Sequence, residues 1–434
     1  MKIHIVGAGP TGMSLAWEIL QSGKHDITIY DRKVSAGGSW WEPEVEKRNL
    51  HAHRVLFDRA FVNTHSLFDE MGIQWNEMFE PSTGGDEHTK FLIKSLKPMD
   101  YISLLSLVFR VGIQPAKYKK VSLEDALGKI SKTGQELLKH LPLIMDGVTW
   151  SRMSAFEFIQ NLNHVVLSKP YTQRVSGKVM CDAMEEALID AGVNFVFGVE
   201  LQNVEYQKDE YKATFSNDTE IDDGYLFLCV DNSPALKLLG DNWGPEAAKK
   251  VSDGTYGAMN ILLYYDKPVT LKSDLEIATK TPWDLQPRVL SDGKTVSCVI
   301  CNLTEEMLEN NPEMFILEVI DQLNLTQPID SKISWGAEWS DESGWSFSQS
   351  SGILSLGGQL PFFGECSKVA MCGMMSPRKT PYSSIEAAIE VSRSLSHQVF
   401  KTRQPLYPLT LSRLTFIILM ILIVLVLVYR NRKL

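Results

Sequence analysis

A glycine-rich turn at the start of the chain constrains the fold more than any other feature. The apolar residues 2–6 lead directly into six residues of the pattern G-x-G-x-x-G: Gly7, Ala8, Gly9, Pro10, Thr11 and Gly12. In such a turn the first glycine allows a tight bend, the second lets the backbone approach phosphates, and the third lets helix and strand pack closely. The N-terminus of the following helix adds unpaired N–H groups and partial positive charge. A dinucleotide is therefore the first ligand to expect.

The residues after the turn support this interpretation. Residues 13–20 have the apolar spacing of a helix, Gly23 is a typical helix stop, and residues 25–30 alternate like a strand. Asp31 ends that strand, followed by Arg32, and an acid at this spacing accepts hydrogen bonds from the ribose hydroxyls of a bound dinucleotide. The alternative is a glycine-rich turn in an ordinary α/β protein, with Asp31 on a solvated loop.

Composition excludes several other classes of protein. The chain has 434 residues, 44% of them hydrophobic and 22% charged, which is typical of a core-forming globular protein long enough for two domains. A net charge of −10 argues against nucleic acid as a partner. The six cysteines are scattered, which favours a reducing, cytosolic environment. Cys298 and Cys301 form a C-x-x-C motif, but on a strand they point to opposite faces, so we expect no metal or redox site there.

A membrane anchor is predicted at the other end of the chain. Residues 414–429 are almost entirely apolar, and basic residues flank them at Arg413 and from Arg430 onward. With residues 409–412 the run is long enough to cross a bilayer, so we place a transmembrane helix at 409–430. Because no signal sequence precedes the glycine turn, we expect a single-pass C-terminal anchor with the main domain facing the cytosol. The sequence does not identify the target membrane.

The order of these patterns predicts two interleaved domains and an α/β fold class. A Rossmann-like dinucleotide-binding domain is expected to comprise residues 1–81, 170–250 and 361–400. An α+β substrate domain would comprise 82–169, which is mostly helical, and 251–360, which contains a second sheet with strands expected at 256–265, 295–301 and 333–339. Helices are expected at 100–111, 122–141, 154–165 and 179–190. The run 101–109 is apolar enough to contact a membrane, but a buried or channel-lining helix is the favoured interpretation.

Four passages in this order resemble the flavin-dependent amine oxidase and phytoene desaturase superfamily. They are the glycine turn with Asp31; Gly37, Gly38, Ser39 and Trp40; residues 177–204; and residues 369–373 followed by 380–388. Together they span nearly the whole chain before the apolar C-terminal run. The resemblance implies an FAD domain interleaved with a substrate domain, and FAD held without a covalent bond, because residues 345–354 contain no cysteine.

The resemblance also assigns roles to individual residues. It implies that Gly37, Gly38 and Ser39 approach the flavin pyrophosphate, that the backbone of Leu201 touches the adenine, and that Gly373 and Met374 contact the cofactor. Ser383 and Glu386 read as an S-x-x-E capping box, which would leave the N–H groups near Ser384 and Ile385 free to face a flavin carbonyl.

Two positions depart from the family pattern. Met374 stands where an acidic or small polar residue is common, and Asn260 stands where amine oxidases often carry a lysine, which makes amine oxidation less expected. The middle of the chain contains no second glycine turn for NAD(P)H, so electrons are expected to enter from the substrate and leave to oxygen, a quinone or another acceptor.

These features predict a membrane-anchored FAD-dependent oxidoreductase that moves a hydride from a small apolar or amphipathic substrate to the flavin. No catalytic residue is identified. Two alternatives stay open: a flavin-fold protein that serves as a membrane-tethered binding or structural component, and a redox-neutral flavin isomerase or mutase.

Two further clusters are weaker candidates. His51 and His53 have the spacing of a metal pair, but no further ligands accompany them, so a lining of the flavin site or a plain loop is favoured. Trp335, Trp339 and Trp345 are expected to pack in a core or to wall an apolar cavity.

Overall fold

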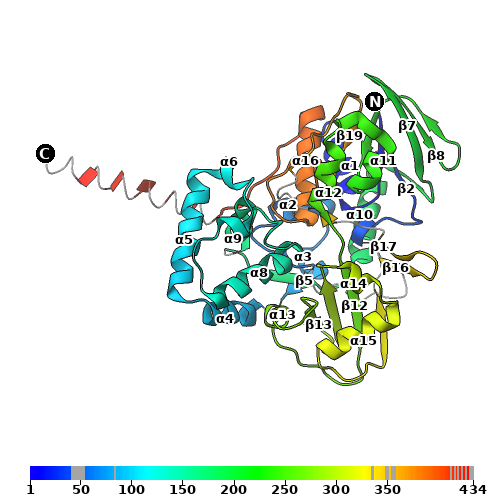
Figure 1. The fold of residues 1–434 in the computed structure, drawn as a ribbon. Coiled ribbons are helices and arrows are strands. Elements are labelled where there is room, and N and C mark those ends of the chain that lie inside the picture. The colour runs from blue at the N-terminus through cyan, green and yellow to red at the C-terminus, as the bar shows by residue number, and fades with distance from the viewer. Residues whose placement is uncertain are drawn as a thin grey trace.

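The computed structural model describes residues 1–40, 54–82, 85–165, 167–333, 337–347, 351–352 and 358–410, together with single residues and pairs between 413 and 429. His51, His53 and Trp335 lie outside the described residues. Figure 1 shows three regions: a helical group on one side, a parallel sheet with its helices, and a second sheet below them.

The parallel sheet takes its strands from widely separated parts of the chain. Its order is β19-β10-β1-β2-β6, and all neighbouring pairs are parallel. The strands are short and apolar because both faces of the sheet are covered: within β10, Phe227 faces one core, whereas Leu226 and Leu228 face another. The bounds are β1 Lys2–Val6, β2 Asp26–Asp31, β6 Asn194–Phe197, β10 Tyr225–Leu228 and β19 Val369–Met371.

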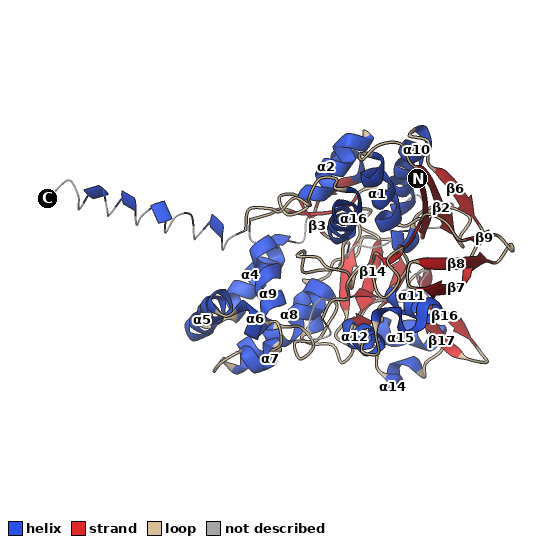
Figure 2. Ribbon diagram, turned by 90° about the horizontal axis from the view of Figure 1, so that it is seen from above, coloured by secondary structure: helices blue, strands red, loops and turns tan. Residues whose placement is uncertain are grey.

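Helices cover one face of this sheet, and a small antiparallel sheet with a helix covers the other (Figure 2). The first face carries α1 (Pro10–Leu20), α10 (Gly177–Asp190) and α16 (Ile385–Phe400), with α2 (Val62–Met71) packed on α16. The second carries β7 (Leu201–Gln207), β8 (Glu210–Phe215), β9 (Glu220–Ile221) and α11 (Asn232–Leu239). Helix α12 (Ala247–Gly254) follows α11.

The region beyond the parallel sheet has a helical part and a sheet part. The helical part is α4 (Gly85–Ser95), α5 (Pro98–Ile113), α6 (Pro115–Tyr118), α7 (Leu123–Ala126), α8 (Lys132–Asp146) and α9 (Ala155–Val165). The antiparallel sheet has the order β13-β14-β12-β15 and packs on α15. Its bounds are β12 Met259–Tyr264, β13 Gln286–Val289, β14 Thr295–Ile300 and β15 Asp330–Ile333, with α13 at Asp274–Ala278, α14 at Glu305–Leu308 and α15 at Pro312–Gln322.

Short elements connect the regions. A small sheet with the order β3-β5-β4 joins Leu56–Phe57, Pro170–Gln173 and Phe79–Pro81, and α3 (Trp75–Met78) precedes β4. Two antiparallel pairs complete the described strands: β11 (Thr255–Tyr256) with β18 (Ser351–Gly352), and the hairpin of β16 (Ala337–Ser340) with β17 (Gly344–Phe347).

The structure corrects three expectations about these elements. The helix expected at 122–141 is two helices, α7 and α8, because Ser131 caps a new helix by accepting a hydrogen bond from the Gly134 N–H at 3.1 Å. The strand expected at 333–339 is divided between β15 and β16. The favoured interpretation of 101–109 as buried or channel-lining is wrong, because Leu105 is 65% exposed and Phe109 is 73% exposed.

No helix among the described residues has both the length and the apolar character needed to cross a bilayer. The predicted anchor at 409–430 lies largely outside the described residues, since fewer than half of the positions from 411 onward are described.

Candidate functional site

The carboxyl ends of four parallel strands open into one cavity of about 2250 Å³. Ligands of open α/β sheets bind at this edge. The turns that follow β1, β2, β10 and β19 each contribute to the wall, at Gly9, Arg32, Cys229 and Gly373. Drug-sized ligands occupy about 300–1,000 Å³. The volume is therefore large enough for a dinucleotide and a second molecule.

The glycine turn has the backbone geometry that phosphate binding requires. Gly7 has a φ of 110°, which disfavours any residue with a side chain, and its N–H donates to the Tyr30 carbonyl at 2.7 Å. Helix α1 then starts at Pro10 without a side-chain hydrogen bond at its N-cap, Gly9. Its first turn therefore presents free N–H groups, and Pro10 and Thr11 line the cavity.

A second glycine turn closes on the first. The Gly37 N–H donates to the Ala8 carbonyl at 2.9 Å, and a Cβ added to Gly38 would lie 2.8 Å from the Gly9 Cα. Gly38 and Ser39 line the cavity. Gly12 lies behind the wall, where an added Cβ would overlap the Gly7 carbonyl. Backbone alone can approach a ligand here, which fits the pyrophosphate of a dinucleotide.

The Asp31 carboxylate, which is expected to bind a ribose, also accepts two hydrogen bonds from the protein backbone. Its Oδ2 accepts a hydrogen bond from the Ala8 N–H at 2.7 Å, and its Oδ1 accepts one from the Lys33 N–H at 2.9 Å. A carboxylate has about four lone-pair sites. Since Asp31 also lines the cavity, two sites remain for ribose hydroxyls. Leu201, at the start of β7, lines the same end of the cavity.

The N-terminus of α16 reaches the middle of the cavity. Gly373, Met374, Ser384 and Ile385 all line it. The Ser392 hydroxyl, in the middle of α16, donates to the Thr11 carbonyl at 2.8 Å, which holds α16 against the first turn of α1. The structure thus brings the four C-terminal candidates and the glycine turns into one site.

The predicted capping box at this helix is wrong. Ser384, not Ser383, is the N-cap, and its hydroxyl accepts from the Ala387 N–H at 3.2 Å. The Glu386 carboxylate instead caps α2, where it accepts from the backbone N–H groups of Asn63 and Thr64 at 2.9 and 2.8 Å. Burial raises the pKa of Glu386 to about 7, against the effect of these hydrogen bonds.

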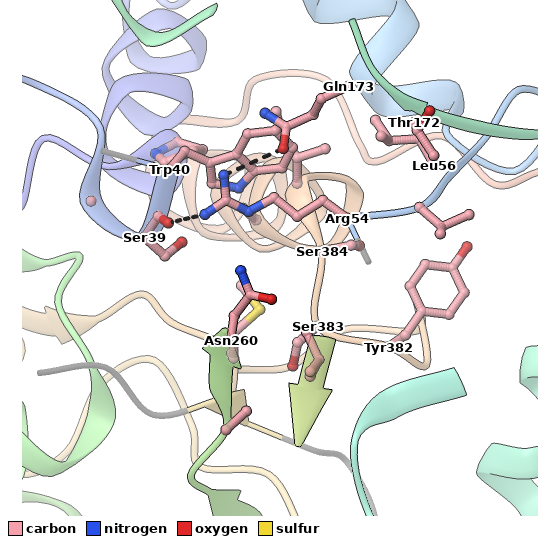
Figure 3. A pocket seen from close by; sticks show the side chains of 18 of the residues that line it. Ser39, Trp40, Arg54, Leu56, Thr172, Gln173, Asn260, Tyr382, Ser383 and Ser384 are labelled. Carbon is pink, nitrogen blue, oxygen red and sulfur yellow. Dashed lines mark hydrogen bonds between the residues drawn. The ribbon is translucent and has the colours of Figure 1, made fainter. Parts of the chain in front are cut away.

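Sequence analysis did not assign Arg54, Gln173 or Tyr382 to the site. Figure 3 shows the Arg54 guanidinium beside Ser39, Trp40 and Gln173. It donates to the Ser39 carbonyl at 2.6 Å and lies 4.7 Å from the centroid of the Trp40 ring. Tyr382, buried beside Phe61, stands in the quoted motif 380–388, so the resemblance contained its signal. Arg54 and Gln173 carry no motif of their own.

Asn260 and Ser383 lie on the other side of the space from Arg54 (Figure 3). Asn260, on β12, is 6% exposed, and its Oδ1 accepts from the Ser297 hydroxyl at 2.8 Å. The Ser383 N–H donates to the carboxylate of Asp146, whose pKa burial raises to about 7. These contacts fix the wall between the glycine turns and the second sheet.

Helices α4, α8 and α9 form one part of the cavity wall, which we call the apolar arm. Besides Asn161, six apolar side chains of these helices line it: Leu92, Leu141, Ile144, Met145, Leu162 and Val165. All but Val165 belong to the core that these helices share or pack on it, and none of the six carries a charge. The arm favours an apolar molecule.

Two other sequence candidates do not form sites in the described part of the chain. Cys298 is buried in β14, and burial raises the pKa of Cys301 to about 12, so neither thiol has thiolate character. Trp339 and Trp345 are cross-strand neighbours with ring centroids 5.3 Å apart, and Trp345 packs on Phe315 in the core of the second sheet. Neither indole lines the cavity.

Comparison with known proteins supports this architecture. The family profile described as "NAD(P)-binding Rossmann-like domain" matches residues 5–69. An oxidoreductase from Methanosarcina mazei has a similar structure, with a TM-score of 0.62 and 14% identity over 92% of this chain and all of its own. Putrescine oxidase, in a structure bound to putrescine, has a TM-score of 0.60 and 13% identity, covering 92% of this chain and 99% of its own.

The chain thus shares its overall fold with these two proteins. A thiamine thiazole synthase from Thermococcus kodakarensis is 24% identical over 152 residues, which is 34% of this chain and 51% of that protein. The chain thus matches only about half the length of this relative, and the shared part is an argument for a nucleotide-binding domain alone.

Proposed function

We propose that the protein is a membrane-anchored oxidoreductase that uses non-covalent FAD to oxidise an apolar or amphipathic substrate. One observation carries the proposal: a single cavity connects the two glycine turns, the start of α16 and the apolar arm. A nucleotide site and an apolar substrate site that share one space have the arrangement required for transfer between substrate and cofactor.

The residues present fit FAD at the nucleotide end. The glycine turns and the start of α1 would hold the pyrophosphate, Asp31 the adenosine ribose, and the backbone near Leu201 the adenine. Ser384 and Ile385 would face the flavin ring with free N–H groups, which favour negative charge. When bound, FAD supplies the acceptor for a hydride. Arg54 adds a fixed positive charge to the same wall.

The protein's own contribution is orientation and the exclusion of water. The aliphatic side chains of the arm desolvate a substrate and direct it toward Tyr382 and Asn260. No described residue stands out as a general base, which agrees with chemistry that relies on the cofactor. Oxygen, a quinone or another acceptor would complete the reaction.

Membrane anchoring belongs to the proposal because of residues 414–429. The run is apolar, has basic residues at both ends, and follows the segment 401–410 that is bound to the domain. For example, the Leu406 N–H donates to the Asn63 side chain at 2.8 Å. We place the helix of 409–430 in a membrane, with the main domain on the cytosolic side.

The substrate proposal is tested by anaerobic reduction of the purified full chain in detergent. We expect lipid-soluble donors to bleach the visible flavin band. Ile144→Lys, which places a charge in the apolar arm, should keep the flavin band and lose at least tenfold in bleaching rate, about 1.4 kcal/mol in the barrier. Leu317→Lys, on the exposed face of α15, is the matched control and should behave like the native chain.

Two results would contradict the substrate proposal. One is bleaching by water-soluble donors alone; the other is equal rates for Ile144→Lys and Leu317→Lys. Turnover of a substrate with no transient bleaching would instead indicate a redox-neutral isomerase.

A further inference from the structure

Helix α5 presents an apolar face that nothing in the described part of the chain covers. Its sixteen residues are all described, and seven apolar side chains are exposed: Met99, Tyr101, Ile102, Leu105, Val108, Phe109 and Ile113. Single exposed apolar residues are normal, but a contiguous face of this size marks a surface that binds something. Its inner face packs on α9, through Leu107 and Val111.

The exposed face of α5 carries no charge. Asp100 is fully buried, where its Oδ1 accepts from the Ser131 N–H at 2.7 Å. Arg110 turns back into the fold and donates to the Ala126 carbonyl at 2.9 Å. The two charged side chains of the helix therefore make contacts inside the fold, and its outer face is suited to an apolar medium.

Lysines stand at both ends of this face. Five are exposed: Lys94, Lys97, Lys117, Lys119 and Lys120. Asp100 is the sole acidic residue between 94 and 120, although the whole chain has a net charge of −10. An apolar helical face with basic residues around it is typical of helices that lie at an anionic bilayer surface. A protein partner with an acidic surface would pair with the lysines but would not bury the apolar face.

The C-terminal apolar segment leaves the domain beside the same group of helices. Burial, with a smaller effect from the charge of Arg413, lowers the pKa of His164 on α9 to about 4, so Arg413 lies near the helix on which α5 packs. A bilayer that receives residues 414–429 therefore lies within reach of α5.

We propose that the outer face of α5 lies in the boundary between headgroups and acyl chains of an anionic bilayer, as a second membrane contact. The inference rests on the membrane location in the proposed function, but not on its flavin chemistry. Since α4, α8 and α9 both support α5 and line the apolar arm, the contact sets the arm close to the lipid from which an apolar substrate would come.

The test places a fluorescent probe on the full chain in vesicles of equal parts phosphatidylcholine and phosphatidylserine. Leu105→Cys carries an environment-sensitive dye on α5. Met314→Cys, on α15 on a different side of the molecule, is the matched control, because Met314 is also exposed, at 53%. The chain without either substitution measures dye on the native cysteines. Flotation establishes that the chain is on the vesicles.

We expect the dye at Leu105 to emit at shorter wavelength than the dye at Met314. Nitroxide lipids should quench it several-fold more, and aqueous iodide several-fold less. Removal of phosphatidylserine should reduce this difference, because the lysines then lose their anionic partners.

Three results would overturn the proposal. If the chain does not float, the membrane location fails as well. If it floats but iodide quenches both dyes equally, the α5 contact alone fails. If the dye at Leu105 is shielded from iodide but untouched by nitroxide lipids, protein covers the face, either a second copy or residues 414–429 of the same chain.

Discussion

Gly38 lies where the two glycine turns touch, and its backbone has a φ of 55°. Gly72, at the C-terminus of α2, has a similar left-handed backbone with a φ of 74°, but an added Cβ there meets nothing within 4 Å. The two positions therefore share the backbone cost of a side chain, about 1 kcal/mol, and differ in the contact with Gly9. They form a matched pair for testing the nucleotide site.

Gly38→Ala should weaken FAD binding at least tenfold, about 1.4 kcal/mol, because the new methyl group separates the turns that hold the pyrophosphate. Gly72→Ala should bind FAD as the native chain does while losing the backbone cost alone, about 1 kcal/mol. Titration of the apoprotein with FAD, together with thermal unfolding of both variants, measures the two effects. Equal affinities for the two variants would argue against a pyrophosphate at the glycine turns.

Sequence patterns identified candidate site residues where a turn of defined backbone geometry requires particular residue types. The three glycines of the first turn lie at the junction of β1 and α1, and Asp31 ends β2, as their spacing indicated, because few arrangements of strand, turn and helix can satisfy that spacing. Gly38 was assigned from the family resemblance. Arg54 and Gln173 could not be found in this way. They reach the cavity through long-range packing across the sheet β3-β5-β4, and no local pattern encodes that contact.

Among the secondary-structure elements, the positions of several helices were predicted from the sequence, but the residues that cap the N-terminus of α16 were not. Ser384 lies one residue after the predicted cap, because Glu386 satisfies the N-terminus of α2 and not that of its own helix. The pattern S-x-x-E could not reveal this, since the partner lies over 300 positions away in the sequence. Helices with strong apolar periodicity, such as α9 and α10, were predicted to within a few residues.

The contact between α8 and the segment before β13 provides a prediction about pH. His140 is 4% exposed, its Nδ1 lies 2.7 Å from the Glu136 carbonyl, and its Nε2 lies 2.9 Å from the Asp284 carboxylate. Both neighbours are acceptors, so both ring nitrogens must donate and the imidazolium is favoured. Burial alone would lower the pKa of His140, but the hydrogen bonds and charge of Asp284 raise it above 6.5.

A raised pKa in the folded state means that His140 stabilises the protein fully below pH 6.5 and loses that effect as the pH rises through the raised value. We expect His140→Gln to lower the free energy of unfolding by about 2 kcal/mol at mildly acidic pH, and by less at mildly alkaline pH. Denaturant unfolding of both chains across this range measures the difference. A difference that does not change with pH would rule out a charged His140.

At the scale of the whole molecule, the parallel sheet collects strands from three distant parts of the chain. The sequence motifs indicated that nucleotide-binding segments occur in three separate blocks of the chain, but they did not indicate the order of the strands in the sheet. The exposed face of α5 was not predictable. An apolar run of this length reads equally well as a core helix, and only the packing of α9 against its other side shows which face remains outside.

The central claim is that the cavity at the carboxyl edge of this sheet holds FAD. The most direct measurement is to purify the full chain in detergent, record its visible spectrum, and identify the molecule released on denaturation by mass spectrometry. We expect a flavin spectrum and release of FAD, one molecule per chain, without proteolysis. A chain that releases NAD(P) or another ligand, or that stays colourless after incubation with FAD, would contradict it.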